Sequence, residues 1–425
     1  METKKKGFPT AFWVCACTEI FERLAYYLGR SLILIFVTAS VATGGLGLSD
    51  TVAANMQSNL TAFSYLLPLF GAVIVDKYIG ARYTTPVGMF IAAAGYFTGG
   101  IAKSSAGVYA MIFLVSLGLA LFKNGAIIGR VITDKSQMDP AFSMRYTLVN
   151  VGAFIGTFLV GILYKDVFAK DGVLGFAPCF KMAALMMVLG GLWYIFVCWR
   201  FLGDLGKLPF KKTLTEEEKA AEAKKKEETG TKQPLTTIEK KRIGAIFVAS
   251  LFSIVFWIFW YLGYMPVYFY WAENMDWVVA GYQVPSTWFD AANSLFCVIL
   301  GPVTAALWKK LAERPQGDMS LFRKTGLGIA IIGVGYLFYA AIDIMRGGEK
   351  ASVLWLIVFA FLLTMGEMFF SPLGHSFISK YSPSRYLAVM MSVWGFATFI
   401  AAKSYGPVYG PVSYTHLRAH ETDQY

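Results

Sequence analysis

The stretch TEIFERLAYYLGR, residues 18–30, decides the fold because it carries four charged side chains inside an apolar run of membrane length. Its polar residues fall at positions 19, 22, 23, 26, 27 and 30, in steps that trace a single stripe along a helix. Charge at membrane depth is tolerated only where it faces a bundle interior or an aqueous cavity. The stretch therefore predicts a helix that lines a polar interior; a salt-bridge cluster that only fixes helix packing is the alternative.

The composition of the whole chain is that of a membrane protein. Hydrophobic residues make up 56% of its 425 residues, and charged residues only 15%, whereas soluble domains carry about a quarter charged residues. Apolar runs long enough to cross a bilayer recur along the whole length. No short apolar region with a cleavage site follows the basic first residues, so we expect the first helix to be retained.

The net charge of +11 follows a membrane topology and does not indicate nucleic-acid binding. Lys and Arg cluster in alternate connections between the apolar spans, whereas the connections at 43–50 and 273–286 contain neither residue. This positive-inside pattern places the N-terminus and the central polar interval on the cytoplasmic side of the cell membrane.

We predict eleven apolar spans, six before a charged interval and five after it. In chain order they cover residues 11–41, 51–75, 82–102, 107–133, 141–164, 177–202, 243–271, 286–310, 322–344, 352–378 and 385–410. They predict an all-α, polytopic transmembrane fold with an N-terminal bundle at 1–203, a charged cytoplasmic linker at 204–242 and a C-terminal bundle at 243–411. We interpret the linker as a solvated tether, although its run TEEEKAAEAKKKEE has the charge spacing of a short amphipathic helix.

Neither the cysteines nor the end of the chain predicts a metal site. The five cysteines lie almost entirely in apolar segments and form no CxxC pair. Residues 412–425 are polar and aperiodic where a twelfth span is expected, which predicts a non-native tail and a missing last helix. His416 and His420 in this tail have the i, i+4 spacing of metal ligands, but we attribute that spacing to chance.

The first span resembles the signature of a known family. EIFERLAYYLGR is similar to the E-x-x-E-R-F-x-Y-Y-G motif of the proton-coupled oligopeptide transporters, which belong to the major facilitator superfamily. The positions that match are Glu19, Glu22, Arg23, Tyr26 and Tyr27. Leu24 replaces the usual Phe, the glycine comes one place late at Gly29, and Arg30 falls where the family has a second arginine.

Further segments carry the resemblance to about residue 410. GAVIVDKYIGAR is similar to the superfamily loop between the second and third helices, which implies a cytoplasmic gate at Gly71, Asp76, Gly80 and Arg82. Other segments similar to family motifs contain Lys123, Asn150, Asn293, Glu367 and Trp394. The resemblance implies a major facilitator fold of two six-helix bundles, here without the last helix.

The resemblance also implies proton-driven symport of di- and tripeptides by alternating access. The implied substrate-binding residues are Arg23, Tyr26, Tyr27, Arg30, Tyr65, Lys123, Asn150, Asn293, Glu367, Ser371 and Trp394. Their cations would receive the peptide carboxylate and Glu367 the ammonium, because a zwitterion needs two poles of opposite sign. The implied proton-coupling residues are Glu19, Glu22, Arg23 and Lys123.

The seventh helix departs from the family pattern. Trp260, Tyr261 and Leu262 occupy the region where the family commonly has Glu or Gln, so we expect Arg30 to lack its usual acidic partner. Pro266 predicts a kink, either structural or a hinge. His375 is interpreted as a histidine at a helix end.

Several alternatives remain open on the sequence alone. A carrier of the same fold could move another small solute, such as nitrate or an organic anion. A membrane sensor or a membrane enzyme is an alternative from a different class. An enzyme would need a nucleophile–base pair or a metal cluster, and neither pattern occurs outside the tail. We expect no cofactor, a proton gradient as the driving force, a lipid bilayer as the surroundings and a monomeric protein.

Overall fold

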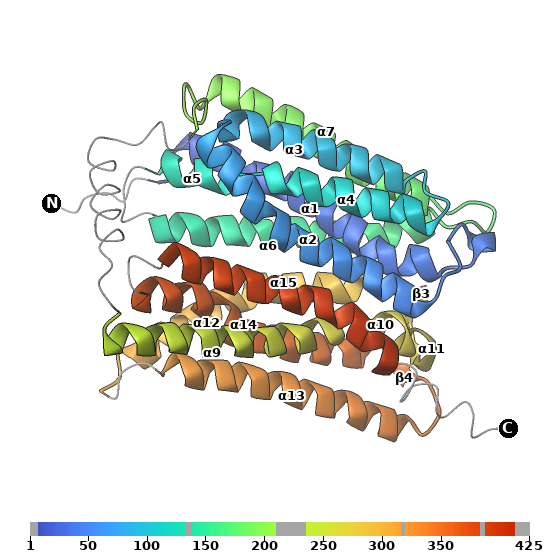
Figure 1. Ribbon diagram of the computed structural model, residues 1–425. Helices are drawn as coiled ribbons and strands as arrows, with labels where there is room; N and C mark the ends of the chain where they lie inside the picture. The colour runs from blue at the N-terminus through green and yellow to red at the C-terminus, as the bar shows by residue number, and fades with distance from the viewer. Residues whose placement is uncertain (1–6, 133–137, 210–234, 316–318, 383–386, 413–425) are drawn as a thin grey trace. The chain divides into compact units, whose positions relative to one another are not determined.

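The computed structural model describes residues 7–132, 138–209, 235–315, 319–382 and 387–412, and most of these residues are helical (Figure 1). Each of the eleven predicted spans contains at least one long helix within the described residues. The all-α prediction is therefore confirmed. Residues 413–425, with both tail histidines and the predicted absence of a twelfth span, lie outside the described residues, as does linker segment 210–234.

The first six spans correspond to eight helical elements and a short 3₁₀ turn. These are α1 (Thr10–Thr38), η1 (Val41–Thr43), α2 (Asp50–Lys77), α3 (Ala81–Gly99), α4 (Ser105–Leu121), α5 (Asn124–Val131), α6 (Met138–Ile162), the π-helical η3 (Leu163–Val167) and α7 (Phe176–Arg200). The predicted fourth span is thus two helices, because the chain leaves helical geometry at Phe122 and Lys123.

The second half begins at a well-formed helix start. Thr236 caps α9 in a capping box with Glu239, which satisfies the first backbone N–H groups of the helix. The helices are α9 (Thr237–Leu262), α10 (Met265–Tyr268), α11 (Tyr270–Asn274), α12 (Trp288–Ala312), α13 (Leu321–Arg346), α14 (Leu354–Tyr381) and α15 (Leu387–Val412). Pro266 lies in α10, just after α9 ends, so the predicted kink is a helix break.

Among the residues described in the second half, four two-residue strands lie in the connections between helices. They are β1 (Met275–Asp276), β2 (Val278–Val279), β3 (Tyr282–Gln283) and β4 (Ala351–Ser352). β1 pairs in parallel with β4, and β2 pairs antiparallel with β3. The first pairing ties the connection before α12 to the one before α14.

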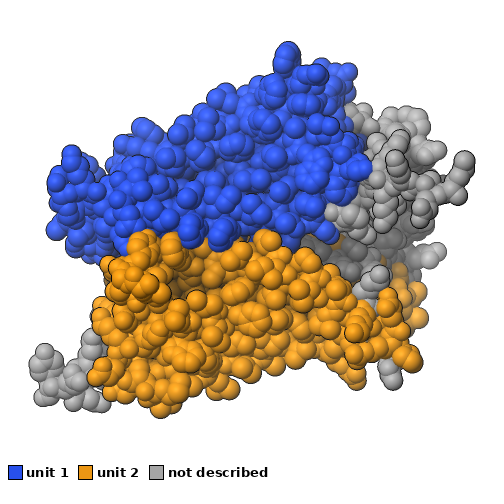
Figure 2. All heavy atoms as spheres, turned by 180° about the vertical axis from the view of Figure 1, so that it is seen from behind, with its two compact units in different colours: residues 1–47, 67–214 blue, residues 48–66, 215–425 orange. Residues whose placement is uncertain are grey.

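The chain forms two compact units, residues 1–47 with 67–214 and residues 48–66 with 215–425 (Figure 2). The predicted N-terminal bundle at 1–203 differs from the first unit chiefly at 48–66, the first part of α2. This part packs on α15, because Ser58 Oγ donates to the carbonyl oxygens of Ala402 and Lys403 at 2.8 and 3.0 Å.

Within the first unit, α6 packs closely on α1 because small residues line the contact. A Cβ atom added at Gly156 would lie 2.5 Å from the carbonyl oxygen of Leu24, and one added at Gly152 would lie 3.0 Å from Arg23 Cβ. Such small residues let helices approach in membranes, where packing rather than the hydrophobic effect drives association. The charged face of α1 is thereby held next to α6.

Seven helical segments of the described residues are long and apolar enough to cross a membrane. They are 50–75, 105–131, 141–167, 176–200, 237–268, 288–308 and 322–346. α1 is not one of them because of the charges of its central stripe. These segments agree with the predicted multi-pass organisation.

The contact between α1 and α6 gives a first prediction. Gly156→Ala is expected to destabilise the protein by roughly 1–3 kcal/mol, because the added methyl group meets rigid backbone. Gly333→Ala in α13 is the matched control, since a Cβ there meets nothing within 4 Å. Thermal unfolding of both variants in one detergent measures the difference, and equal melting temperatures would contradict the packing argument.

Candidate functional site

The charged stripe of α1 contains an ion pair between sequence neighbours. Arg23 Nε donates to Glu22 Oε2, and Arg23 Nη2 lies 2.6 Å from Glu22 Oε1. The Glu22 side chain is fully buried, whereas the Arg23 side chain is 26% exposed. Bidentate pairing is the strong form of such a contact, so the charge of Glu22 is compensated within its own helix.

Glu19 is compensated by residues from two other helices. Its Oε1 accepts hydrogen bonds from Arg145 Nε of α6 at 2.9 Å and from Asn124 Nδ2 of α5 at 3.1 Å. Asn124 Nδ2 also lies 2.8 Å from the carbonyl oxygen of Cys15. Three helices therefore meet at one carboxylate.

The sequence did not single out the two partners of Glu19. The available signal was their position, since Arg145 lies inside a predicted span and Asn124 follows Lys123 directly. A cation and an amide inside apolar spans indicate a buried partner.

Lys123 lies at the break between α4 and α5. Its Nζ donates to the carbonyl oxygen of Pro68 at 2.7 Å, and its backbone N–H donates to Thr85 Oγ1 at 3.3 Å. The side chain is partly buried. These contacts join the break to α2 and α3, and the predicted role of Lys123 in proton coupling stays a prediction.

Two tyrosines of α1 lie beside its arginines. The guanidinium carbon of Arg23 lies 5.0 Å from the centre of the Tyr26 ring, and that of Arg30 lies 6.0 Å from the Tyr27 ring. The two rings meet edge to face at 5.4 Å. Cation–π contact can hold an arginine without neutralising it, and Arg23 in addition carries the ion pair with Glu22.

Asn150 is held against its own helix. Its Nδ2 donates to the carbonyl oxygen of Tyr146, one turn earlier in α6, at 3.0 Å. Tyr65 is 45% exposed. The side chains of Ser371, His375 and Asp76 lie outside the described residues, and the binding roles expected of Asn150 and Tyr65 stay predictions.

The second unit has its own buried acidic site. Asn293 Nδ2 of α12 lies 3.1 Å from Glu367 Oε2 of α14 and 2.8 Å from Thr364 Oγ1, and Cys297 Sγ lies 3.8 Å from the same carboxylate oxygen. Glu367 is 8% exposed. Among the described residues, no Lys or Arg forms an ion pair with Glu367.

One aromatic side chain adjoins this acidic site, and a buried aromatic stack lies in the same unit. Trp260, which stands in the region where the family commonly has an acid or amide, is buried and lies next to the Glu367 carboxylate. Trp394 is stacked on Phe370 with ring centres 6.0 Å apart, and Phe370 is stacked on Phe256 at 4.0 Å. Trp394 thus belongs to a buried aromatic stack, and its role as a pocket wall stays a prediction.

The predicted gate loop joins helix ends of the first unit. Arg82 Nη2 donates to the carbonyl oxygen of Cys198 at 2.6 Å, Nη1 donates to that of Gly203, and Arg82 N lies 3.1 Å from Gly206 O. A side chain at Gly80 would clash with the backbone near Gly206. The start of α3 is therefore tied to the end of α7, and the gate role expected of these residues stays a prediction.

Among the predicted residues, Glu19, Glu22 and Arg23 form one cluster in the first unit, and Asn293 and Glu367 form another in the second. Basic and acidic groups are paired on α1, whereas Glu367 meets only neutral donors among the described residues. Within that part of the chain, no group of three His, Cys, Asp or Glu residues could hold a metal ion.

Comparison with known proteins identifies relatives of this chain. The sequence model of the POT family matches residues 202–416. A Bacillus subtilis protein named uncharacterized transporter YclF is 25% identical over 439 residues, which cover 94% of this chain and 87% of the relative. A di-/tripeptide transporter of Lactococcus lactis subsp. cremoris is 24% identical, with 91% of this chain and 86% of the relative covered.

Solved structures match the fold closely. The crystal structure of a peptide transporter POT in complex with sulfate aligns with a TM-score of 0.81 at 24% identity, covering 95% of this chain and 89% of that chain. A POT family transporter in complex with 5-aminolevulinic acid gives 0.83 at 24% identity, covering 97% and 93%. The predicted major facilitator fold is confirmed.

The fold and the apolar helices define a multi-pass membrane transporter, and not an enzyme. The chain belongs to the POT family, as the α1 signature predicted.

The pairing of Glu19 gives the second prediction. Arg145→Gln is expected to destabilise the protein by about 2 kcal/mol, because it leaves a carboxylate that is 2% exposed without its cation. Glu19→Gln combined with Arg145→Gln should recover most of this loss. Arg200→Gln, at the exposed end of α7, is the control for losing an arginine. Thermal unfolding measures the stability of each variant. Equal losses of stability in Arg145→Gln and Arg200→Gln would contradict the pairing.

Proposed function

We propose that this protein is a proton-coupled symporter of di- and tripeptides that works by alternating access. It acts as a monomer in the cytoplasmic membrane, with its N-terminus in the cytoplasm, and the proton gradient drives it without a cofactor. The relatives named di-/tripeptide transporters and the matching POT structures support this function. The observation that carries the proposal is the buried Glu367, which meets neutral donors and no cation among the described residues.

Glu367 is suited to hold the ammonium group of a peptide. A buried carboxylate without a cation is costly, so it gains from either a proton or a cationic ligand. Asn293 orients the carboxylate by donating to Oε2, while it also donates to Thr364. The arrangement leaves the charge of the carboxylate for a ligand to neutralise.

The cations of α1 are suited to the carboxylate end of the peptide. Arg23 and Arg30 each lie over a tyrosine ring, and a planar guanidinium can bind a carboxylate in a bidentate manner. A zwitterionic peptide therefore has a proposed partner for each pole. The aromatic rings give contact area that does not depend on one particular side chain.

The ion pairs of α1 suggest how a proton is used. A proton that binds Glu22 removes the negative charge that holds Arg23, and the guanidinium then becomes available to a substrate carboxylate. The neighbouring Glu19–Arg145 contact links the same stripe to α6, so a change of charge on α1 alters its attachment to the bundle. This order of events couples proton entry to substrate binding and helix movement.

A test of the ammonium site separates peptide transport from transport of a simple anion. Glu367→Ala should lower dipeptide uptake into proteoliposomes by roughly 30-fold or more, the effect of losing one partner of a desolvated charge pair. Glu349→Ala removes an exposed carboxylate and should leave uptake unchanged. Nitrate uptake that exceeds dipeptide uptake and is unaffected by Glu367→Ala would instead support the anion carrier.

A second test addresses proton coupling. Glu22→Gln should abolish accumulation of dipeptide against its gradient when a pH gradient is imposed, because the glutamine cannot carry the proton. Exchange of labelled for unlabelled dipeptide across the membrane, which needs no net proton movement, should persist. The proposal is wrong if the variant still accumulates dipeptide uphill at the normal rate.

A further inference from the structure

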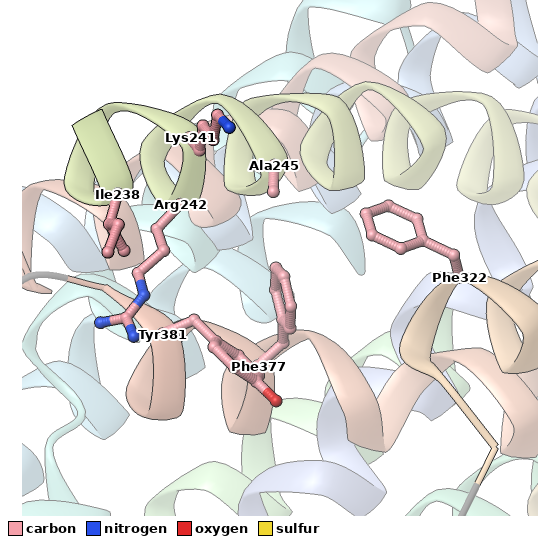
Figure 3. Close-up of a pocket in the computed structure, with 7 residues that line it drawn as sticks. All are labelled: Ile238, Lys241, Arg242, Ala245, Phe322, Phe377 and Tyr381. Atoms are coloured by element: carbon pink, nitrogen blue, oxygen red, sulfur yellow. The ribbon is translucent and has the colours of Figure 1, made fainter.

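A cavity of about 300 Å³ lies in the second unit, away from the Glu367 cluster (Figure 3). The beginning of α9, the beginning of α13 and the end of α14 surround it. The volume is at the lower end of the range for small-molecule sites.

The walls of the cavity are almost entirely apolar, and two basic residues of α9 are among those that line it. Phe322 and Phe377 meet edge to face with ring centres 6.2 Å apart, and Tyr381 lies 4.9 Å from Phe377. Lys241 and Arg242, both exposed, come from α9. Figure 3 shows Arg242 extending from α9 towards Tyr381, with the Phe322 and Phe377 rings turned to the space below the helix.

The position of the cavity suits the boundary of a bilayer. The membrane-length segments that include α9 and α13 run over 237–268 and 322–346, so the cavity lies where both begin. The same helix starts also carry Lys240 and Arg323, both exposed. An aromatic wall with basic residues at this level is typical of the membrane interface.

We propose that this cavity binds an anionic phospholipid such as phosphatidylglycerol. Arg242 and Lys241 bind the phosphodiester, and the first part of an acyl chain lies against Phe322 and Phe377. Charge complementarity selects lipids with a net negative charge, because the choline of a zwitterionic lipid would bring a positive charge to the two cations. The apolar wall favours a lipid over free phosphate, which has no apolar part to bury.

Binding to the full chain in a neutral detergent tests this inference independently of transport. Native mass spectrometry and thermal shift compare phosphatidylglycerol, phosphatidylcholine with the same acyl chains, and inorganic phosphate. The double variant Lys241→Gln with Arg242→Gln should weaken phosphatidylglycerol binding roughly thirty-fold. Each interfacial cation raises the affinity for an anionic lipid by a factor of about five. The control double variant, Lys240→Gln with Arg323→Gln, removes two charges beside the cavity. It should change the affinity for phosphatidylglycerol by less than about threefold.

The apolar half of the site needs its own variant. Phe322→Ser keeps both cations and should weaken phosphatidylglycerol binding about tenfold. Equal binding of the two phospholipids, or equal losses in the cavity and control pairs, would overturn the proposal. Protection by inorganic phosphate at the same concentrations as phosphatidylglycerol would also overturn it, because the site would then be one for the free anion.

Discussion

The cost of charge at membrane depth is the constraint on which the first unit depends. The charge of Glu22 is compensated inside α1 by Arg23, and the charge of Glu19 is compensated by Arg145 of α6. The second contact is made only if α6 lies close to α1, which the glycines of α6 permit. The Glu19–Arg145 pair that joins α6 to α1 therefore lies on the same stripe as Glu22, the group that the proposed mechanism protonates.

The second unit meets the same constraint differently. Glu367 is surrounded by an amide, a thiol and aromatic rings, and within the described residues it forms no ion pair. Trp260 explains part of this setting, since it brings an aromatic side chain to a region where the family commonly has an acid or amide. The carboxylates of α1 in the first unit are thus ion-paired, whereas the second unit presents a carboxylate whose charge a ligand can compensate.

Much of this could be predicted from the sequence, because membrane helices are long apolar runs and the α1 motif is specific. The stripe predicted that Glu22 and Arg23 share a polar face, and the structure places them in contact. The partnership of Glu19 with Arg145 could not be predicted, since it joins residues 126 apart in sequence and depends on how α6 packs. Periodicity also missed the break at Lys123, because apolar composition continues across it.

The two ion pairs of α1 differ in when they can form during synthesis. Arg23 follows Glu22 directly, so that pair is complete as soon as α1 leaves the ribosome. Glu19 has no such partner until Arg145 is made, and Arg145 belongs to the fifth span, after four others have entered the membrane. Since a lone acidic residue at a helix centre costs about 2.5–3.5 kcal/mol to insert, α1 should remain near the translocon until α6 arrives. A built-in pause in biogenesis thus follows from the spacing of one carboxylate and its arginine.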